Sequence, residues 1–317
     1  MSLIVASEDE YEDLLGLWSD LESGLGLVLS HPDSVQEFRL RIGQYDRWMQ
    51  DLLQYDADVG LYLLFQLAIN SPVGYSASHA LVCAVLCHLI SADFELPKNE
   101  RDSLVCAALT MNIAMTALQD ELATQHSRPS AEQQVAIRAH AAKGALMLAD
   151  LGITDSLWLE TIQLHHKEDD PGPDLGELIP PHRLAHILHV VDRYAALISP
   201  RQSREGRSAT ESAKSVIHGS AEQESAVGES LVRIVGLCPP GTFVQLDDEE
   251  VAVVTRRSPS PNLPDVAIVI DQKGDLIRPP SLHQTSCGRP VISSALVAAT
   301  VQERINHHLV LQLSARR

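Results

Sequence analysis

The chain has 317 residues, of which 45% are apolar, 21% are charged and only 4% are aromatic. This length predicts about two domains with a substantial core, and the composition excludes a disordered or collagen-like chain. Few aromatic residues among abundant Leu, Ala and Val favour packed helices over a β-sandwich. The formal net charge of -18 argues against binding along the phosphates of a nucleic acid polymer and against a polybasic membrane contact.

No apolar run reaches the roughly 18 residues that a membrane-spanning helix requires. The first residues, MSLIVASEDEYEDLL, lack a basic region and turn acidic early, so we expect no secretory signal. Five scattered cysteines form no CxxC pair and no disulfide framework. We therefore expect a cytoplasmic protein that does not bind a membrane.

The N-terminal region, residues 1–60, carries thirteen acidic and three basic side chains. Apolar residues recur at helical spacing over 8–29 and again over 34–55, with a proline-containing break between the two segments. Ser34 is placed as the N-cap of the second helix, and a third helix is predicted over 58–69. We interpret the acidic side chains as the solvated face of a packed helical region; the alternative is a docking surface for a basic protein partner.

A run of mostly buried helices is predicted next. Their expected spans are 79–90, 101–118, 131–151, 156–166 and 181–199. The segment 79–90 is apolar nearly all round, which is typical of a central core helix, and Gly152 is placed to end the third of these helices. Short helices are expected over 200–228.

The character of the sequence changes after Cys238. Alternating β-branched residues over 242–257 and 265–277 predict strands of a small antiparallel unit, and a closing helix is predicted over 291–306. The predicted fold is mainly α, a helical bundle with an N-terminal helical extension and a small C-terminal β-containing tail. The three predicted regions are 1–70, 71–236 and 237–317.

Histidine is unusually frequent, with fourteen residues, and six of them lie between His140 and His189. The adjacent pair His165-His166 ends a predicted helix. Asp192 lies inside the apolar run ILHVVDRYAALI, where a carboxylate is costly unless a cation or hydrogen-bond donors satisfy it. The alternative is an aspartate that pairs with an arginine or caps a neighbouring helix. Three histidines at helical spacing are interpreted as one helix face: His182, His186 and His189.

The chain resembles the HD-GYP family, within the HD superfamily of metal-dependent phosphohydrolases, in the order and spacing of five residues: His79, His140, His165, His166 and Asp192. The resemblance implies an HD-type all-α domain whose His and Asp side chains ligate two or three iron or manganese ions. These ions would activate a water that attacks a phosphodiester of cyclic di-GMP. Clustered cations suit that reaction because they lower the pKa of bound water and stabilise the charge of the transition state.

The chain departs from the family pattern where the family carries a His-Asp pair and a lysine. Those three positions hold Met111, Asn112 and Met115. A thioether is a poor ligand for manganese or iron(II), a neutral amide cannot bridge two cations as a carboxylate does, and loss of the lysine removes a cation from the phosphate pocket. Met111 and Met115 are expected to lie side by side, four residues apart on one helix, so that apolar packing replaces the metals. No catalytic residue is therefore assigned.

The signature loop of the family is also altered. The chain reads HHKEDDPGPD, with Lys167 at an acidic position and no tyrosine, and Asp170 and Gly172 are the remnants of the pattern. Tyr75 occupies a position where some members of the family supply an additional carboxylate ligand.

The candidate metal ligands are His79, His140, His165, His166 and Asp192. Three of them, His140, His165 and His166, can hold one iron, manganese or zinc ion as three imidazoles with an open position. The alternative is a set of core histidines that are hydrogen-bonded to one another and to Asp192, with no metal bound.

Two further patterns have both a functional and a structural interpretation. Arg201 and Arg204 are candidate ligand-binding residues because guanidinium groups suit phosphates; the alternative is that they pair with the acidic N-terminal helices. His79, Cys83 and Cys87 lie along one stripe of an apolar helix, where core packing is favoured over metal ligation.

We therefore expect a degenerate HD-GYP-like signalling protein that is non-catalytic or crippled for hydrolysis of cyclic di-GMP and acts by binding a partner or ligand. The alternative is a metal-dependent phosphohydrolase that uses a reduced metal site. Three partners stay open: cyclic di-GMP, a protein that docks on the acidic N-terminal helices, and a second copy of the chain.

Overall fold

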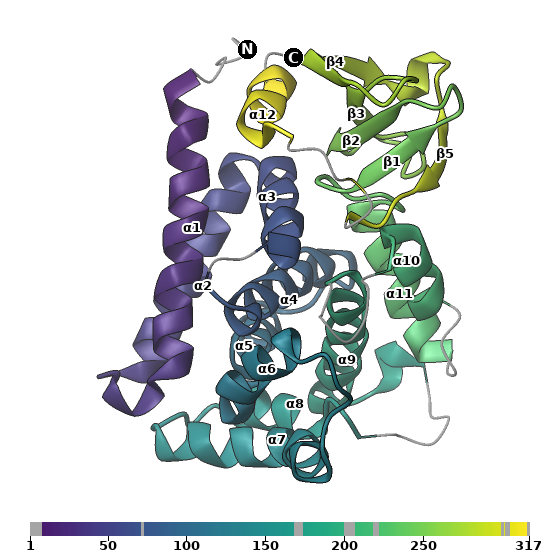
Figure 1. Ribbon diagram of the computed structural model, residues 1–317. Coiled ribbons are helices and arrows are strands. Elements are labelled where there is room, and N and C mark those ends of the chain that lie inside the picture. Colours follow the sequence, from purple (N-terminus) through teal and green to yellow (C-terminus); the bar gives the residue numbers. More distant parts are fainter. Residues whose placement is uncertain are drawn as a thin grey trace.

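The computed structural model describes residues 8–70, 73–167, 174–199, 207–217, 222–298, 301 and 305–315. The protein is mainly helical, and a small antiparallel sheet follows the helices near the C-terminus, which confirms the predicted fold class (Figure 1). The α-helices are α1 (Glu8–Ser30), α2 (Phe38–Tyr55), α3 (Ala57–Asn70), α4 (Tyr75–Asp93), α5 (Lys98–Thr110), α6 (Thr116–Thr124), α7 (Ala131–Asp150), α8 (Ser156–Leu164), α9 (Pro180–Ile198), α10 (Ala209–Ile217), α11 (Glu222–Val235) and α12 (His307–Ala315).

The three N-terminal helices pack on one another, and α1 also contacts α4 and α12. In Figure 1, α1 runs along the left side of the molecule, and Trp18 and Leu21 on its inner face are fully buried. Helix α2 begins later than predicted, because Pro32 starts a short 3-10 turn that ends at Ser34. The prediction of Ser34 as an N-cap is therefore wrong, since the residue at that helix boundary is Glu37.

Helix α4 is the central core helix, as its composition predicts. It contacts α1, α3, α5, α6, α9 and α11, and residues on all its faces are buried. By length and composition alone α4 could cross a membrane, but 78% of the apolar window is buried inside the protein. A helix that is apolar all round and covered on every side is the expected centre of a helical domain.

The helix predicted over 101–118 is broken, which corrects the sequence-based expectation. Helix α5 ends at Thr110, a 3-10 turn follows over Ile113–Met115, and α6 begins immediately after it. The Thr110 hydroxyl donates to the carbonyl of Cys106 at 2.7 Å and accepts the indole N–H of Trp158 at 2.9 Å. Met111 and Met115 therefore do not lie on one helix, contrary to the prediction.

The five strands form an antiparallel sheet in the order β4-β3-β2-β1-β5. The strands are β1 (Phe243–Leu246), β2 (Val251–Arg256), β3 (Asp265–Ile270), β4 (Leu276–Gln284) and β5 (Ile292–Ala295). The closing helix predicted over 291–306 is wrong, because β5 lies there and pairs with β1, and α12 begins only at His307. The β-branched residues at the start of that segment favour a strand.

The sheet is joined to the helices by ion pairs and by apolar packing. Arg256 of β2 binds Asp56 at 2.6 Å, and Arg257 binds Asp58 of α3. One hydrophobic core runs from the helices to Val253 on one face of the sheet, and a smaller cluster covers the other face. The division into 1–70, 71–236 and 237–317 stays a prediction.

Candidate metal centre

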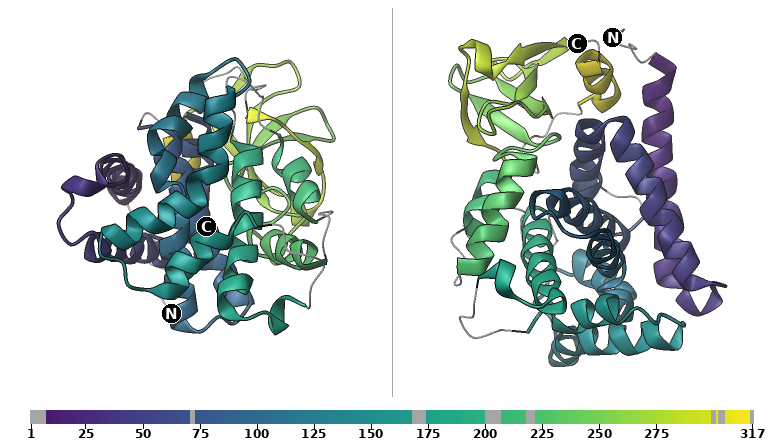
Figure 2. Two further views of the ribbon diagram at one scale, coloured as in Figure 1. Left: turned by 90° about the horizontal axis from the view of Figure 1, so that it is seen from below. Right: turned by 180° about the vertical axis from the view of Figure 1, so that it is seen from behind.

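Four helices bring the predicted metal ligands together. His79 comes from α4, His140 from α7, the pair His165-His166 from the end of α8, and Asp192 from α9. Helices α7 and α8 lie at the end of the molecule far from the sheet, as Figure 1 and the right-hand view of Figure 2 show. The order of these residues in the sequence thus becomes a cluster in space.

The first donor group consists of His140, His165 and His166, whose ligand atoms all lie within 4.8 Å of one another. The Nδ1 atoms of His140 and His165 lie 2.5 and 2.6 Å from the backbone carbonyls of Ile137 and Ile162. A carbonyl accepts only from an N–H, so these contacts place the proton on Nδ1 and leave the lone pair on Nε2. Both Nε2 atoms are buried and have no hydrogen-bond partner among the described residues.

Burial opposes protonation of His165 and His166. Burial first, and the neighbouring His166 second, lower the pKa of His165 to about 3. The pKa of His166 is also lowered, mainly by burial. Neutral imidazoles with a fixed tautomer and an unused Nε2 are the form in which histidine binds a metal, so these residues fit one transition-metal ion.

The second donor group consists of His79, Cys83 and Asp192, again within 4.8 Å of one another. The Asp192 Oδ1 lies 2.7 Å from the His79 Nε2, and the Cys83 Sγ lies 3.7 Å from the same nitrogen. Tyr75 stacks on the ring of His79 at 5.4 Å, so it supports that ring rather than supplying a ligand. This group adds a thiol that the sequence interpretation assigned to core packing.

Asp192 connects the two donor groups. Its Oδ2 lies 3.8 Å from the Nε2 of His166 in the first group, and its Oδ1 bonds His79 in the second. Burial alone would raise the pKa of Asp192, but the hydrogen bond and charge of His79 outweigh it and hold that pKa below its usual range. The carboxylate is therefore ionised, and its two oxygens face different donor groups.

Met111 and Ile113 lie against α7, the helix that carries His140. A Cβ added to Gly144, one turn of α7 after His140, would lie 3.6 Å from the Met111 carbonyl oxygen and 3.7 Å from Ile113. Met111 is 1% exposed and belongs to the hydrophobic core, whereas Asn112 and Met115 are half-buried. The segment that corresponds to the family His-Asp pair thus packs against the helix that carries His140.

Several predicted residues do not join the cluster. Lys167 is exposed, and four others lie outside the described residues: Asp170, Gly172, Arg201 and Arg204. His189, which the sequence interpretation placed on a helix face, has its Nδ1 2.9 Å from the carbonyl of His165 and its ring 5.8 Å from that of His166. The sequence contains one indication that His189 lies near the cluster, because His189 precedes Asp192 by one turn of the same helix.

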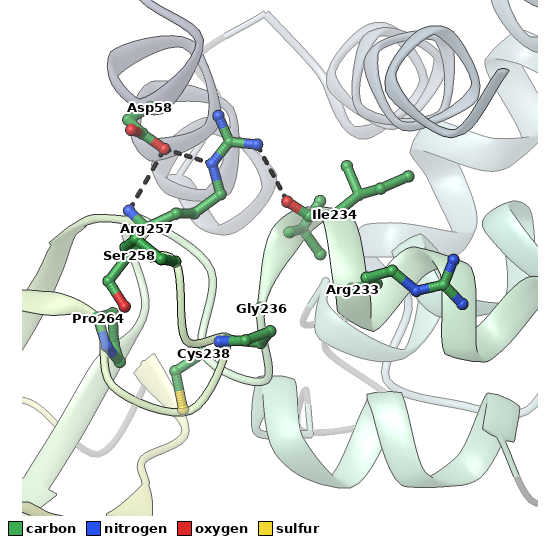
Figure 3. Close-up of a pocket in the computed structure, with 11 residues that line it drawn as sticks. Asp58, Arg233, Ile234, Gly236, Cys238, Arg257, Ser258 and Pro264 are labelled. Carbon is green, nitrogen blue, oxygen red and sulfur yellow. Dashed lines mark hydrogen bonds and ion pairs between the residues drawn. The ribbon is translucent and has the colours of Figure 1, made fainter. Parts of the chain in front are cut away.

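A separate surface cavity of about 350 Å³ lies between the end of α11 and the loop from β2 to β3 (Figure 3). Its two guanidinium groups are already bound: Arg257 donates to Asp58 and to the carbonyl of Ile234, and Arg233 pairs with Asp93. The cavity shares no lining residue with either donor group. We therefore treat it as a feature of the junction between helices and sheet.

Comparison with known proteins gives one match in sequence and one match in fold. No family model matches the chain. The chain is 25% identical over 196 residues to the cyclic di-GMP phosphodiesterase PA4108 of Pseudomonas aeruginosa, a match of 61% of this chain and 47% of the relative. The chain thus spans about half the length of this curated relative.

Among solved structures, the fold is similar to that of Bd1817, an HDG"Y"P protein from Bdellovibrio bacteriovorus, with a TM-score of 0.50. The similarity covers 71% of each chain at 14% sequence identity, so it shows the fold alone. Together with the sequence match and the order of the clustered histidines, it shows that the chain is similar to HD-GYP proteins.

Proposed function

We propose that this HD-GYP-like protein is a signalling module that binds cyclic di-GMP or a protein partner and hydrolyses cyclic di-GMP poorly or not at all. The observation that carries the proposal is the environment of Met111 and Asn112. The Met111 side chain is 1% exposed in the hydrophobic core, and a neutral amide follows it. These groups supply neither an imidazole ligand nor the negative charge that bridges two cations.

The first donor group still fits one iron, manganese or zinc ion. Three imidazoles leave an open coordination position, and the backbone carbonyls of Ile137 and Ile162 orient two of them. When bound, such an ion attracts phosphate oxygens and lowers the pKa of a water molecule. The chain orients His140 and His165 and shields these two imidazoles from water, whereas His166 is exposed.

A second candidate function, hydrolysis with a reduced metal site, is favoured by one observation. Asp192 faces both donor groups, so a carboxylate is present between two positions that can each hold a cation. Hydrolases with two cations use such a bridge to hold a phosphate and its attacking oxygen. This candidate predicts measurable turnover despite the change at residue 112.

Two measurements on the full chain distinguish the two functions: binding of cyclic di-GMP by calorimetry and its cleavage by chromatography. We expect binding without cleavage, and His165→Ala should lose the metal held by the first donor group. The matched control is His126→Ala, because His126 is exposed and belongs to neither donor group. Turnover that disappears in His165→Ala but persists in the control would instead establish the hydrolase.

The acidic N-terminal helices offer less free charge to a partner than the sequence suggests. Asp46 forms a buried ion pair with Arg101 at 2.8 Å, and Asp56 and Asp58 bind arginines of the sheet region. Some of the acidic side chains thus stabilise the fold itself. A basic partner on α1 and α2, and a second copy of the chain, stay predictions.

A further inference from the structure

We propose that Cys83 supplies a thiolate ligand to a second cation position, formed with His79 and Asp192, and that this position prefers zinc to manganese or iron. The inference goes beyond the proposed function, because it concerns which cation the second donor group selects, whether or not cyclic di-GMP is hydrolysed. Thiolate ligands favour zinc, whereas carboxylate and water ligands favour manganese.

The geometry of the two α4 ligands suits a tetrahedral zinc ion. His79 and Cys83 are four residues apart, so both side chains lie on one face of α4. Their ligand atoms are 3.7 Å apart, and a tetrahedral zinc ion with ordinary bond lengths would hold a nitrogen and a sulfur about 3.6 Å apart. The pair therefore needs almost no rearrangement.

Asp192 completes the position with a small movement. Its Oδ1 is now hydrogen-bonded to the His79 Nε2 at 2.7 Å, and the corresponding edge of a tetrahedral site is about 3.3 Å. The Asp192 side chain is 18% exposed, so one side of it is not enclosed by protein. The carboxylate can thus move by about half an ångström while α4 stays in place.

The charges of this group also favour a dication. Binding releases the Cys83 S–H proton to solvent, which leaves a thiolate, and the His79 proton moves from Nε2, where it now meets Asp192, to Nδ1, with no change of oxidation state. The thiolate and the ionised carboxylate then carry two negative charges, which balance a dication in a buried place. His79 and Cys83 are 2% and 0% exposed, so an uncompensated charge there would be costly.

The competing explanation is that Cys83 is an ordinary core cysteine, and the chain contains its own control. Cys87 lies one turn further along α4, is equally buried, and does not belong to either donor group. If burial alone explained Cys83, the two cysteines would behave alike toward a metal. Under the proposal, only Cys83 responds.

The test loads the chelator-treated full chain with cobalt(II), which replaces zinc and reports a bound thiolate by a charge-transfer band in the near ultraviolet. We expect this band in the parent protein and in Cys87→Ala, and its loss in Cys83→Ala. We also expect Cys83→Ala to weaken zinc binding at least tenfold relative to manganese. Cys83→Ser, which keeps the size of the side chain, gives the same readout where the alanine variant does not fold.

Two outcomes would overturn the proposal: absence of the band in the loaded parent protein, or its persistence in both Cys83 variants. Failure of the proposed function is recognised separately, because His165→Ala removes a ligand of the first donor group only. That variant should retain the thiolate–cobalt band, and turnover of cyclic di-GMP has no bearing on the band.

Discussion

The burial of His165 makes the stability of the metal-free protein depend on pH. The side chain is 2% exposed, and burial lowers its pKa from an ordinary 6.5 to about 3. Below pH 6.5 the unfolded chain therefore binds a proton at this imidazole that the folded protein does not bind. The stabilising contribution is complete above the unfolded pKa and is lost progressively as the pH falls toward about 3.

The magnitude follows from the two pKa values. Between about pH 7.5 and about pH 5.5, protonation of the unfolded imidazole rises from roughly one tenth to nine tenths, while the folded imidazole stays neutral. The free energy of unfolding should fall by about 1.4 kcal/mol from this residue alone. Urea unfolding of the chelator-treated protein at both pH values measures the change.

The reference variant is His165→Asn, whose side-chain amide can still donate to the carbonyl of Ile162 but does not titrate. Half-buried histidines with a lowered pKa, such as His88 and His307, titrate in both proteins and cancel in the comparison. The parent protein should therefore lose about 1.4 kcal/mol more than the variant on acidification. Equal losses in the two proteins would refute the assignment of a depressed pKa to His165.

Three further substitutions test the packing around the site by urea unfolding of the metal-free protein. Met111→His should lower stability by about 1–3 kcal/mol, because it places a polar ring in an apolar pocket; unchanged stability would contradict that packing. Gly144→Ala should raise stability by about 0.5–1 kcal/mol, because the new Cβ meets its nearest atom at 3.6 Å and helical glycine is entropically costly; a decrease would show that α7 is too close. Asp120→Ala should cost about 0.5–2 kcal/mol, because its carboxylate accepts the backbone N–H of Ser76 in the first turn of α4, and no loss would refute this capping role.

The sequence predicts most of the helices and the residues of the first donor group. The apolar periodicity of α4, α7 and α9 marks their spans to within a few residues. His140 and His165 could be selected because polar residues within apolar helices need a partner or a ligand. Periodicity alone does not show that these histidines form a site. That expectation came from their order along the chain, which resembles a known family.

The errors arise where contacts between distant parts of the chain decide the local structure. Helix α5 ends at Thr110, whose hydroxyl accepts the indole N–H of Trp158 in another helix. The residues around Thr110 in the sequence do not predict this hydrogen bond. Ile292 begins a strand because β1 offers an edge to pair with. Cys83 shares its helix stripe with Cys87, and only the position of α9 shows which of the two cysteines faces Asp192.

We expect the charge at residue 112 to govern how two cations share this site. Two unit charges about 4 Å apart interact by about 4 kcal/mol near a protein surface, and two dications by about four times as much. Two dications carry four positive charges. The three imidazole ligands of the first donor group add no negative charge, so Asp192 and a Cys83 thiolate supply the two negative charges of the site. Binding of the two cations should therefore be anticooperative, with one tight and one much weaker equivalent of metal in a calorimetric titration.

Asn112→Asp adds a third negative charge beside α7 and should strengthen binding of the weaker equivalent at least tenfold. The parent protein, whose Asn112 amide has nearly the same shape, serves as the control. Two equally tight equivalents in the parent protein would mean that charge at residue 112 does not limit the site.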